Sequence, residues 1–309
     1  MKILVTGGAG FIGSNIADAY IDAGHDVTVL DNLSTGRREL VNPKARFFEM
    51  DIRSDDAAEL IVEEKFEVIN HHAAQIDVRK STADPIFDAE INILGTLNIL
   101  ESGVKSGIKR FIFASTGGAI YGEQDYFPAD EEHPVRPVSP YGIGKLSMEK
   151  YLYYYGVNYG LDYIVLRYAN VYGPRQNPYG EAGVVAIFSD KLIKREPAII
   201  NGSGTQTRDY VYIRDVVQAN KLALVTDQKG EIFNIGTSIE TDVNEIFRTV
   251  RNYIDPSVDE KHGPEKPGEQ SRSVIDPQKA VRVLGWKAEY DLKTGLKETV
   301  EWFLSEKDS

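Results

Sequence analysis

The stretch KILVTGGAGFIG, residues 2–13, decides the fold. A β-branched apolar run ends there in a turn with glycines at 7, 10 and 13, and apolar residues at helical spacing follow as far as Asp22. Between a strand and a helix, Gly7 allows the tight turn, Gly10 lets the backbone approach a pyrophosphate, and Gly13 lets the helix pack closely on the strand. The helix N-terminus presents free N–H groups to phosphate. The stretch therefore predicts a dinucleotide-binding turn.

Strand and helix patterns alternate through the first half of the chain. Alternation of this kind predicts an α/β fold of the Rossmann type, a doubly wound parallel sheet covered on both faces. Past residue 170, loops rich in Pro, Gly and polar residues prevail. We therefore expect residues 1–170 to form the dinucleotide-binding domain and 171–309 a smaller C-terminal substrate-binding α/β domain, with Glu231–Gly236 able to return to the first sheet. Further strands are expected at 26–30, 46–50, 68–71, 110–114 and 163–168, and further helices at 57–65, 87–106 and 144–159.

Composition excludes several classes of protein. The chain has 309 residues, with 35 Lys+Arg against 47 Asp+Glu, a net charge of −12, and no Cys. Without Cys there is no disulfide scaffold, thiolate metal site or cysteine nucleophile. The acidic balance argues against a general nucleic-acid binder. No apolar run suits a membrane span and no signal peptide is visible, so a cytoplasmic location is the default expectation. His71 and His72 suggest no metal site, because adjacent strand residues point to opposite faces.

An acidic residue selects the expected cofactor. Asp31 ends the second strand about twenty residues after the first, where a carboxylate binds the adenosine ribose hydroxyls. It would repel a 2′-phosphate, which favours NAD over NADP. Arg37 and Arg38 lie where arginines can serve NADP, but we expect them in a solvated loop. Asp51, which ends the third strand, suits a contact to the adenine edge.

A tyrosine and a lysine indicate the chemistry. Tyr141 and Lys145 are four residues apart at a helix start and so share one helix face. A free phenol has a pKa of about 10, but an ammonium group and an oxidised nicotinamide both lower this pKa. Tyr141 could then take a proton from a sugar hydroxyl as hydride leaves the same carbon. The hydroxyl of Ser115 or Thr116, at the carboxyl end of the fifth strand, would hold that oxygen.

The ordered set of motifs resembles the extended short-chain dehydrogenase/reductase family, and more narrowly its UDP-glucose (UDP-galactose) 4-epimerases. The resemblance covers essentially the whole chain. It implies tightly held NAD, a UDP-sugar substrate, a transient 4-keto sugar, and a homodimer. The motifs are the three glycines, Asp31–Gly36, His72-Ala73-Ala74, Ser115-Thr116, Tyr121-Gly122, Tyr141-x-x-x-Lys145 and Arg167–Pro174.

The resemblance also implies roles for single residues. Tyr141 would be the base, and Lys145 its electrostatic partner and a ligand of the nicotinamide ribose. Thr116 would bind O4 of the sugar, but its spacing to Tyr121 is one residue longer than usual, so Ser115 stays an alternative. The implied cofactor-binding residues are Gly7, Gly10, Phe11, Ile12, Gly13, Asp31, Asn32, Ser34, Thr35, Gly36, Asp51, Ile52, Ala73, Ala74, Gln75, Asn92, Tyr141, Lys145 and Tyr168.

The implied substrate-binding residues come mainly from the second half of the chain. Arg208 resembles the diphosphate-binding arginine of the family, and Glu269 would meet the uridine ribose. Lys266 stands where the family usually has Arg, so the charge is kept but the bidentate fork is lost. Ser273 occupies a position that resembles the family's size gate, the residue beside the sugar C2 substituent. If the spacing in this loop differs by one or two residues, Arg272 or Val274 faces the sugar instead. The set is Thr116, Tyr141, Asn170, Val184, Asn201, Arg208, Lys266, Glu269 and Ser273.

A missing acid narrows the reaction. By the resemblance, the sister 4,6-dehydratases carry a carboxylate two residues before the Tyr-Gly that follows the fifth strand. Here that position is Ala119, preceded by Gly118, and neither can transfer a proton. Epimerisation needs only one acid/base group, so C4 epimerisation of UDP-glucose and UDP-galactose is the favoured reaction. The alternatives are a UDP-glucuronate 4-epimerase and, from another class, a non-catalytic NAD-sensing protein on the same fold.

Two helical stretches indicate a dimer. Residues 87–106 and 144–159 look apolar on more than one face. One face must cover the sheet, and the other needs a partner because a large exposed apolar patch is unusual in a monomer. By the resemblance, the two helices would pair with their copies as a four-helix bundle.

Overall fold

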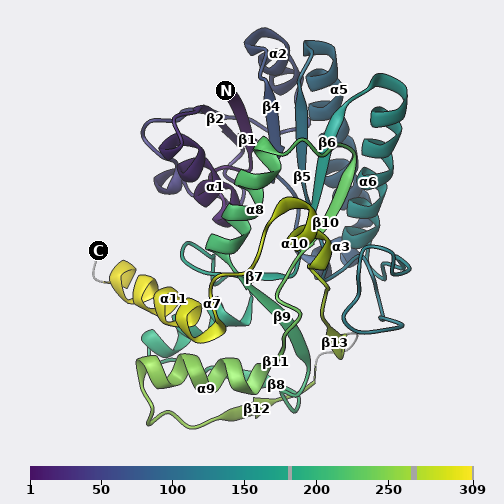
Figure 1. Cartoon of the computed structure of the whole chain (residues 1–309). Coiled ribbons are helices and arrows are strands. Elements are labelled where there is room, and N and C mark those ends of the chain that lie inside the picture. Colours follow the sequence, from purple (N-terminus) through teal and green to yellow (C-terminus); the bar gives the residue numbers. More distant parts are fainter. Residues whose placement is uncertain (180–182, 266–269, 308–309) are drawn as a thin grey trace.

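A parallel sheet forms the larger part of the molecule (Figure 1). The computed structural model describes residues 1–179, 183–265 and 270–307. Within them the sheet has seven strands in the order β10-β6-β5-β4-β1-β2-β3. The predicted doubly wound α/β fold is confirmed. The strands are β1 (Lys2–Thr6), β2 (Asp26–Asp31), β3 (Arg46–Glu49), β4 (Val68–His71), β5 (Arg110–Thr116), β6 (Asp162–Tyr168) and β10 (Glu231–Ile235).

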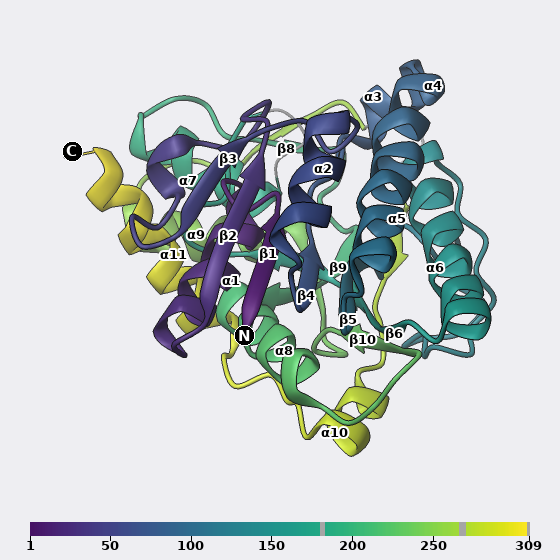
Figure 2. The ribbon, with the colours of Figure 1, turned by 90° about the horizontal axis from the view of Figure 1, so that it is seen from above.

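Helices cover both faces of this sheet (Figure 2). Helices α1 (Phe11–Asp22) and α8 (Ile213–Val225) lie on one face, where Tyr20 and Asn220 hydrogen-bond to Asn70 of β4. Helices α2 (Asp55–Glu64), α5 (Thr96–Ser106) and α6 (Pro140–Tyr159) lie on the other, where Thr96 meets His71. Since consecutive strand residues point to opposite faces, neighbouring residues at the carboxyl edge enter different environments.

The helix predicted at 87–106 is built in three pieces. It begins at Pro85, after Asp84, whose side chain accepts the Phe87 N–H at 3.0 Å. Proline is favoured at this position because it has no N–H to leave unpaired. A π-helical segment, a feature common at functional sites, separates the two α-helical pieces. The pieces are α4 (Pro85–Ala89), the π-helical η2 (Glu90–Gly95) and α5, with α3 (Val78–Ala83) before them.

Helix α6 starts four residues before the predicted 144–159. The Ser139 hydroxyl accepts the Gly142 N–H at 3.2 Å and caps the helix, and Pro140 takes its first position. Tyr141 therefore lies in the first turn, with Lys145 one turn later.

The smaller part of the molecule faces the carboxyl ends of the large sheet (Figure 1). A four-stranded sheet has the order β11-β9-β13, with β7 also beside β9, and a two-stranded sheet pairs β12 with β8. The elements are β7 (Asn170–Tyr172), β8 (Ile199–Asn201), β9 (Thr207–Tyr212), β11 (Glu240–Asp242), β12 (Lys261–Gly263), β13 (Arg272–Ser273), α7 (Val184–Ile193), α9 (Val243–Ile254), α10 (Gln278–Leu284) and α11 (Leu292–Lys307), and a 3₁₀ turn, η1 (Arg38–Leu40), lies in the larger part.

Two elements beyond residue 170 belong to the larger part of the molecule, which the seven-stranded sheet forms. Strand β10 pairs with β6, from Glu231 opposite Ile164 to Ile235 opposite Tyr168, and α8 packs on α1. We therefore propose a discontinuous division, in which the domain of residues 1–170 also includes α8 and β10. No helix in the described residues is both long and apolar enough to cross a membrane.

Candidate active site

The glycine turn after β1 forms a cradle that side chains would fill. Gly7 has φ +68°, and a Cβ there would lie 2.6 Å from the Ala73 nitrogen. A Cβ at Gly13 would lie 2.3 Å from the Gly7 oxygen, so the start of α1 approaches β1 only because residue 13 is glycine. A Cβ at Gly10 would lie 3.2 Å from the same oxygen. The N-terminus of α1, which begins with Phe11 and Ile12, thus stays open to a phosphate group.

The carboxylate of Asp31 lies against this turn. It accepts the Ala9 N–H at 3.0 Å and the Leu33 N–H at 2.9 Å. Burial raises its pKa, and the two backbone donors act in the opposite direction. Each oxygen keeps a lone pair for a further donor such as a ribose hydroxyl. Gly36 folds back on this residue, since a Cβ there would lie 2.8 Å from Asp31 Oδ1, and Ser34 and Thr35 are exposed beside it.

The neighbouring carboxylate, Asp51, has cationic and amide partners that the sequence did not predict. Arg53 makes bonds of 2.9 and 2.8 Å to its two oxygens, and Asn32 donates to it at 3.2 Å. Arg53 lowers the pKa of Asp51 to about 2. Ile52 is buried beside it. Arg37 and Arg38, which lie where arginines can bind NADP, contact other protein groups. Arg37 pairs with Glu39 at 3.5 Å, and Arg38 lies 4.2 Å from the Phe47 ring centroid.

The loop after β4 is held by an amide clamp. Asn92 Oδ1 accepts the Gln75 N–H at 2.9 Å, and Asn92 Nδ2 donates to the Gln75 carbonyl at 2.8 Å. The Ala73 N–H lies 3.3 Å from Thr6 Oγ1, and Ala74 completes the loop. The π-helical turn thus contributes a buried side chain that fixes the path of residues 73–75 beside the glycine cradle.

Tyr141 and Lys145 meet at the carboxyl end of β5. Burial raises the pKa of Tyr141 to about 12, the charge of Asp88 adds to this effect, and the neighbouring Thr116 side chain, as a hydrogen-bonding partner of the phenol, opposes it. Lys145 Nζ donates to the Ala114 carbonyl at 2.8 Å and lies 5.9 Å from the Tyr141 ring centroid. Burial lowers the pKa of Lys145 to about 8.

The sheet separates the two candidate hydroxyls. Ser115 is 4% exposed and donates to Glu149 of α6 at 2.6 Å. Glu149 is in turn held by the Arg167 guanidinium through bonds of 3.0 and 2.6 Å. Thr116, which accepts the Ala119 N–H at 3.2 Å, is the hydroxyl that the structure brings to Tyr141.

The bonds of Ser115 belong to a larger buried group, which we call the charged network. Arg167 also donates to Tyr121 Oη at 2.9 Å, and that phenol donates to Asn234 at 2.7 Å. Ser115, Arg167 and Asn234 are direct neighbours across β5, β6 and β10. The network therefore fixes α6 to three strands. Its members are Ser115, Tyr121, Glu149, Arg167 and Asn234.

The opposite face carries what we call the neutral network: Tyr20, Asn70, His72, Tyr168 and Asn220. Asn70 donates to Asn220 Oδ1 at 2.9 Å, and Asn220 donates to Tyr168 Oη at 2.8 Å. The Tyr168 phenol and His72 Nε2 form the next hydrogen bond of the network, at 3.2 Å. The buried Nδ1 of His72 has no hydrogen-bond partner. The phenol of Tyr168, an expected cofactor contact, is thus already engaged.

Both ring nitrogens of His71 are engaged on the other face, with Thr6 at 2.8 Å and Thr96 at 3.0 Å. Among the residues described, no three His, Asp or Glu side chains are grouped closely enough to hold a metal ion.

The substrate candidates occupy two places. Asn170 starts β7, and its buried Nδ2 has no hydrogen-bond partner. A Cβ at Gly118 would lie 3.9 Å from both Asn170 Oδ1 and Thr116 Oγ1, so these two side chains flank an open position. Arg208 of β9 lies beside Ser273 of β13. Val184 is the first residue of α7, and Lys266 and Glu269 lie outside the described residues.

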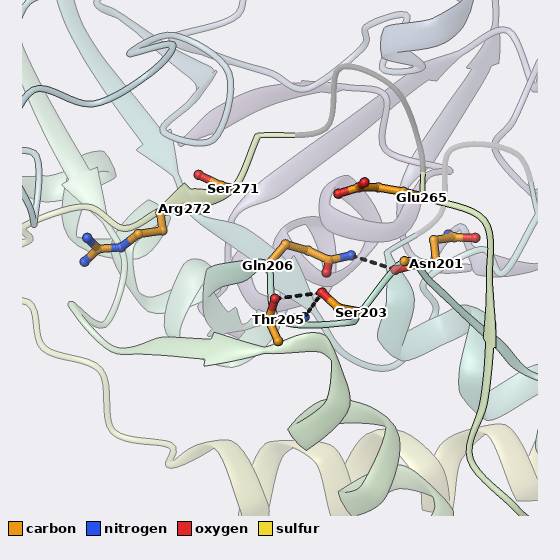
Figure 3. Close-up of a pocket in the computed structure, with 8 residues that line it drawn as sticks. Asn201, Ser203, Thr205, Gln206, Glu265, Ser271 and Arg272 are labelled. Atoms are coloured by element: carbon orange, nitrogen blue, oxygen red, sulfur yellow. Dashed lines mark hydrogen bonds between the residues drawn. The ribbon is translucent and has the colours of Figure 1, made fainter.

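A polar pocket of about 240 Å³ lies at the far end of β9 (Figure 3). Gln206 Nε2 lies 3.4 Å from the Asn201 carbonyl, with Glu265 across the pocket (Figure 3). Of its lining residues, Asn201 was an expected contact and Arg272 an alternative to Ser273; Gln206 and Ser271 were not predicted, because turn residues of this type carry no chemical signature by themselves. The lining residues are Asn201, Gly202, Ser203, Thr205, Gln206, Glu265, Ser271 and Arg272.

The chain belongs to the NAD dependent epimerase/dehydratase family, whose model matches residues 3–236. A protein of Methanocaldococcus jannaschii described as a "Putative UDP-glucose 4-epimerase" is 51% identical, over 97% of each chain. The crystal structure of a Thermotoga maritima UDP-glucose 4-epimerase with UDP-glucose superposes with a TM-score of 0.97 at 47% identity, over 99% of each chain. A Thermus thermophilus UDP-glucose 4-epimerase complex with NAD gives 0.92 at 42% identity, over 98% of this chain and 99% of that one.

Proposed function

We propose that this protein is an NAD-dependent UDP-glucose 4-epimerase, which interconverts UDP-glucose and UDP-galactose. The observation that carries the proposal is the placement of Tyr141, Thr116 and Lys145 at the same carboxyl edge of the sheet as the glycine cradle, with no acid at position 119. The relatives described above carry the same activity in their names.

Cofactor binding falls to the residues around the cradle. The glycine turn and the start of α1 would hold the pyrophosphate, and Asp31 the adenosine ribose. The carboxylate of Asp31 fits the ribose hydroxyls of NAD and disfavours a 2′-phosphate, which carries the same sign of charge. Loop 73–75 and Lys145 would line the nicotinamide end. When bound, NAD supplies the acceptor for the hydrogen at C4 of the sugar and returns that hydrogen to the opposite face.

Proton transfer falls to Tyr141. With a pKa of about 12 in the protein alone, the phenol is protonated at neutral pH. The positive charges of Lys145 and of an oxidised nicotinamide favour the phenolate, so Tyr141 becomes a competent base when the cofactor is present. Thr116 would hold the sugar O4 oxygen while Tyr141 removes its proton. The same phenol then returns the proton, which is why a second acid is unnecessary.

The nucleotide part of the substrate would lie along β9. Asn170 offers an unpaired buried amide donor near Thr116, and Arg208 offers a cation farther along. The polar pocket around Asn201 and Gln206 suits a uridine group, whose edges need hydrogen-bond partners. We assign Val184, Lys266 and Glu269 to the same substrate by the family pattern.

The test is an assay of C4 inversion without added cofactor. Purified protein is incubated with UDP-galactose, and UDP-glucose is measured. The panel includes dTDP- and GDP-glucose and UDP-glucuronate, so that a different base or an acidic sugar would be detected. Denatured protein should release NAD or NADH. Absence of product with every sugar, or release of mainly NADP, would overturn the proposal.

Ser273 is proposed to leave space for an N-acetyl group at C2. It is 3% exposed on β13, beside Arg208. The side chain is much smaller than tyrosine, so an acetamide would not overpack the site. We expect the enzyme to convert UDP-GlcNAc as well, and Ser273→Tyr to suppress this reaction while it spares UDP-galactose. Equal loss of both reactions would show that Ser273 is not a selective gate.

We propose a homodimer formed through α4–α6. Several large apolar side chains on these helices are exposed, including Ile86 at 72%, Leu94 at 59% and Val157 at 66%. Tyr151, Tyr153, Tyr154 and Tyr159 add to this surface. Pairing with a second copy would cover it. A monomer mass in solution scattering at working concentration would contradict the dimer. The cytoplasmic location remains a prediction.

A further inference from the structure

Asp88 of helix α4 is a buried carboxylate that the proposed reaction does not use. It is 1% exposed. Its Oδ1 accepts hydrogen bonds from Gln75 Nε2 and Asn92 Nδ2, both at 2.9 Å. In the described part of the chain, it forms no ion pair with any Lys, Arg or His. A buried carboxylate without a cation costs considerable free energy, so its presence calls for a physical explanation.

The bonds of Asp88 orient the amide clamp. Asn92 points its NH₂ group to Asp88 and to the Gln75 carbonyl, which leaves its oxygen for the Gln75 N–H. Gln75 likewise points its NH₂ group to Asp88, and its oxygen accepts the Asp77 N–H at 2.6 Å. Gln75 Nε2 also donates to the Asp77 carbonyl at 2.9 Å. The acceptor at position 88 therefore reinforces the orientation that the backbone bonds give both amides, and with it the path of the loop beside the cofactor cradle.

The same carboxylate lies against helix α6 between its two functional residues. A Cβ at Gly144 would lie 3.6 Å from Asp88 Oδ2 and 3.4 Å from Asn92 Cβ. Gly144 is three residues after Tyr141, on the same helix face, and directly precedes Lys145. Asp88 Oδ2 therefore lies at contact distance from the segment of α6 that joins these two residues. The charge of this carboxylate raises the pKa of Lys145 against the effect of burial, and it raises the pKa of Tyr141.

The other titratable groups near the pair contribute less negative charge. Glu149, on the next turn of α6, also raises the pKa of Lys145, after Asp88, and is paired with Arg167. His71, the last residue of β4, and His72 after it are neutral at working pH, because burial and the charge of Lys145 lower their pKa values. Asp88 is the carboxylate near Lys145 that has no cationic partner of its own.

We propose that Asp88 is a positioning residue of the reaction: its carboxylate orients the Gln75–Asn92 clamp and provides, across Gly144, the countercharge that keeps Lys145 protonated. The inference rests on the proposed function for the role of Tyr141 and Lys145. It goes beyond that function in assigning a residue that touches neither substrate nor cofactor.

Asp88→Asn separates charge from hydrogen bonding. The asparagine oxygen can still accept from both amides, but the charge is gone. Both limbs of the pH profile of kcat should move to lower pH, by about one pH unit, because loss of a negative charge lowers the pKa of the phenol and of the ammonium alike. The NAD content of the purified variant should stay at the wild-type level. Glu59→Gln, which removes an exposed carboxylate on α2, is the matched control and should shift neither limb.

Asp88→Ala tests the clamp. It removes the charge and the acceptor together, so the NAD retained after gel filtration should fall several-fold while Asp88→Asn retains it. Limbs that stay at the wild-type pH in Asp88→Asn, with only a lower maximum, would overturn the countercharge. Equal NAD retention in both variants would overturn the clamp. NAD retention needs no turnover, so this result stands even if no UDP-sugar is converted, whereas an inactive wild type would contradict the proposed function itself.

Discussion

The charged and the neutral networks lie on opposite faces of one sheet and end at the same carboxyl edge. In three pairs of consecutive residues, one side chain lies on each face of the sheet: Ser115 and Thr116, Arg167 and Tyr168, His71 and His72. The network under α6 contains a buried ion pair, Glu149 with Arg167, whereas the bonds of the neutral network under α8 join uncharged partners. At this edge of the sheet, the charged network therefore supports helix α6 with its acid/base residues. The neutral network supports the side where the cofactor would bind.

The largest effect expected is on chemistry at the α6 face. Tyr141→Phe removes the only ionisable atom of the ring and keeps its packing. We expect kcat to fall by roughly two to four decades, the usual scale for a general acid–base group, with NAD still bound. The matched change on the α8 face is Tyr20→Phe, which removes a buried phenol of the neutral network far from the reacting atoms and should leave kcat unchanged. An unchanged kcat in Tyr141→Phe would remove this residue from the mechanism.

The next effect is on stability, and it tests the contrast between the networks directly. Arg167→Met leaves Glu149 buried without its cation, which should lower the free energy of unfolding by about 3–5 kcal/mol. Tyr20→Phe should lower it by only about 1–2 kcal/mol, since the lost bonds, to the Asn220 carbonyl and from Asn70, are both neutral. Urea denaturation at constant NAD concentration measures both.

A double variant makes this second test specific. Glu149→Leu together with Arg167→Met removes both charges, and most of the lost stability should return because no charge remains buried alone. If the single and the double variant are equally unstable, the loss comes from packing and not from the ion pair.

The third effect depends on pH. Burial, with a smaller contribution from Lys145, lowers the pKa of His72 to about 3. The unfolded chain binds a proton near pH 6.5 and the folded chain does not, so this stability is complete above about pH 6.5 and is lost as the pH falls. Between pH 7.5 and pH 5 the loss should be about 2 kcal/mol. His72→Asn removes the titration, so the stability advantage of wild type over the variant should shrink by that amount. A constant difference would mean that His72 titrates normally.

The cofactor-binding turn and the acid/base pair could be predicted from the sequence because their motifs are local. The glycine turn, Asp31 and the Tyr141–Lys145 spacing each lie within one strand–turn–helix unit, although the helix that carries Tyr141 begins four residues before its predicted start. The charged and the neutral network could not be predicted from the sequence. Glu149 meets Arg167 only because α6 crosses β6, and a glutamate on a helix otherwise suggests a solvated face. Asp88 is another case, since its burial depends on the contact of α4 with α6.

The smallest effect decides the question that the sequence left open between two adjacent hydroxyls. Because a strand alternates its faces, the sheet assigns Ser115 to the charged network and Thr116 to Tyr141. Thr116→Val keeps the shape but removes the hydroxyl that would hold the sugar oxygen, and kcat/KM should fall about tenfold, about 1.4 kcal/mol of lost transition-state stabilisation. Ser115→Ala removes one bond to a carboxylate that Arg167 still holds, so we expect a loss of about 1 kcal/mol in stability and kcat/KM within about twofold of wild type. The comparison is internal, because each variant deletes one hydroxyl from neighbouring residues of β5. A larger loss of kcat/KM in Ser115→Ala than in Thr116→Val would reverse the assignment and would mean that the longer loop before Tyr121 rotates the strand end when substrate binds.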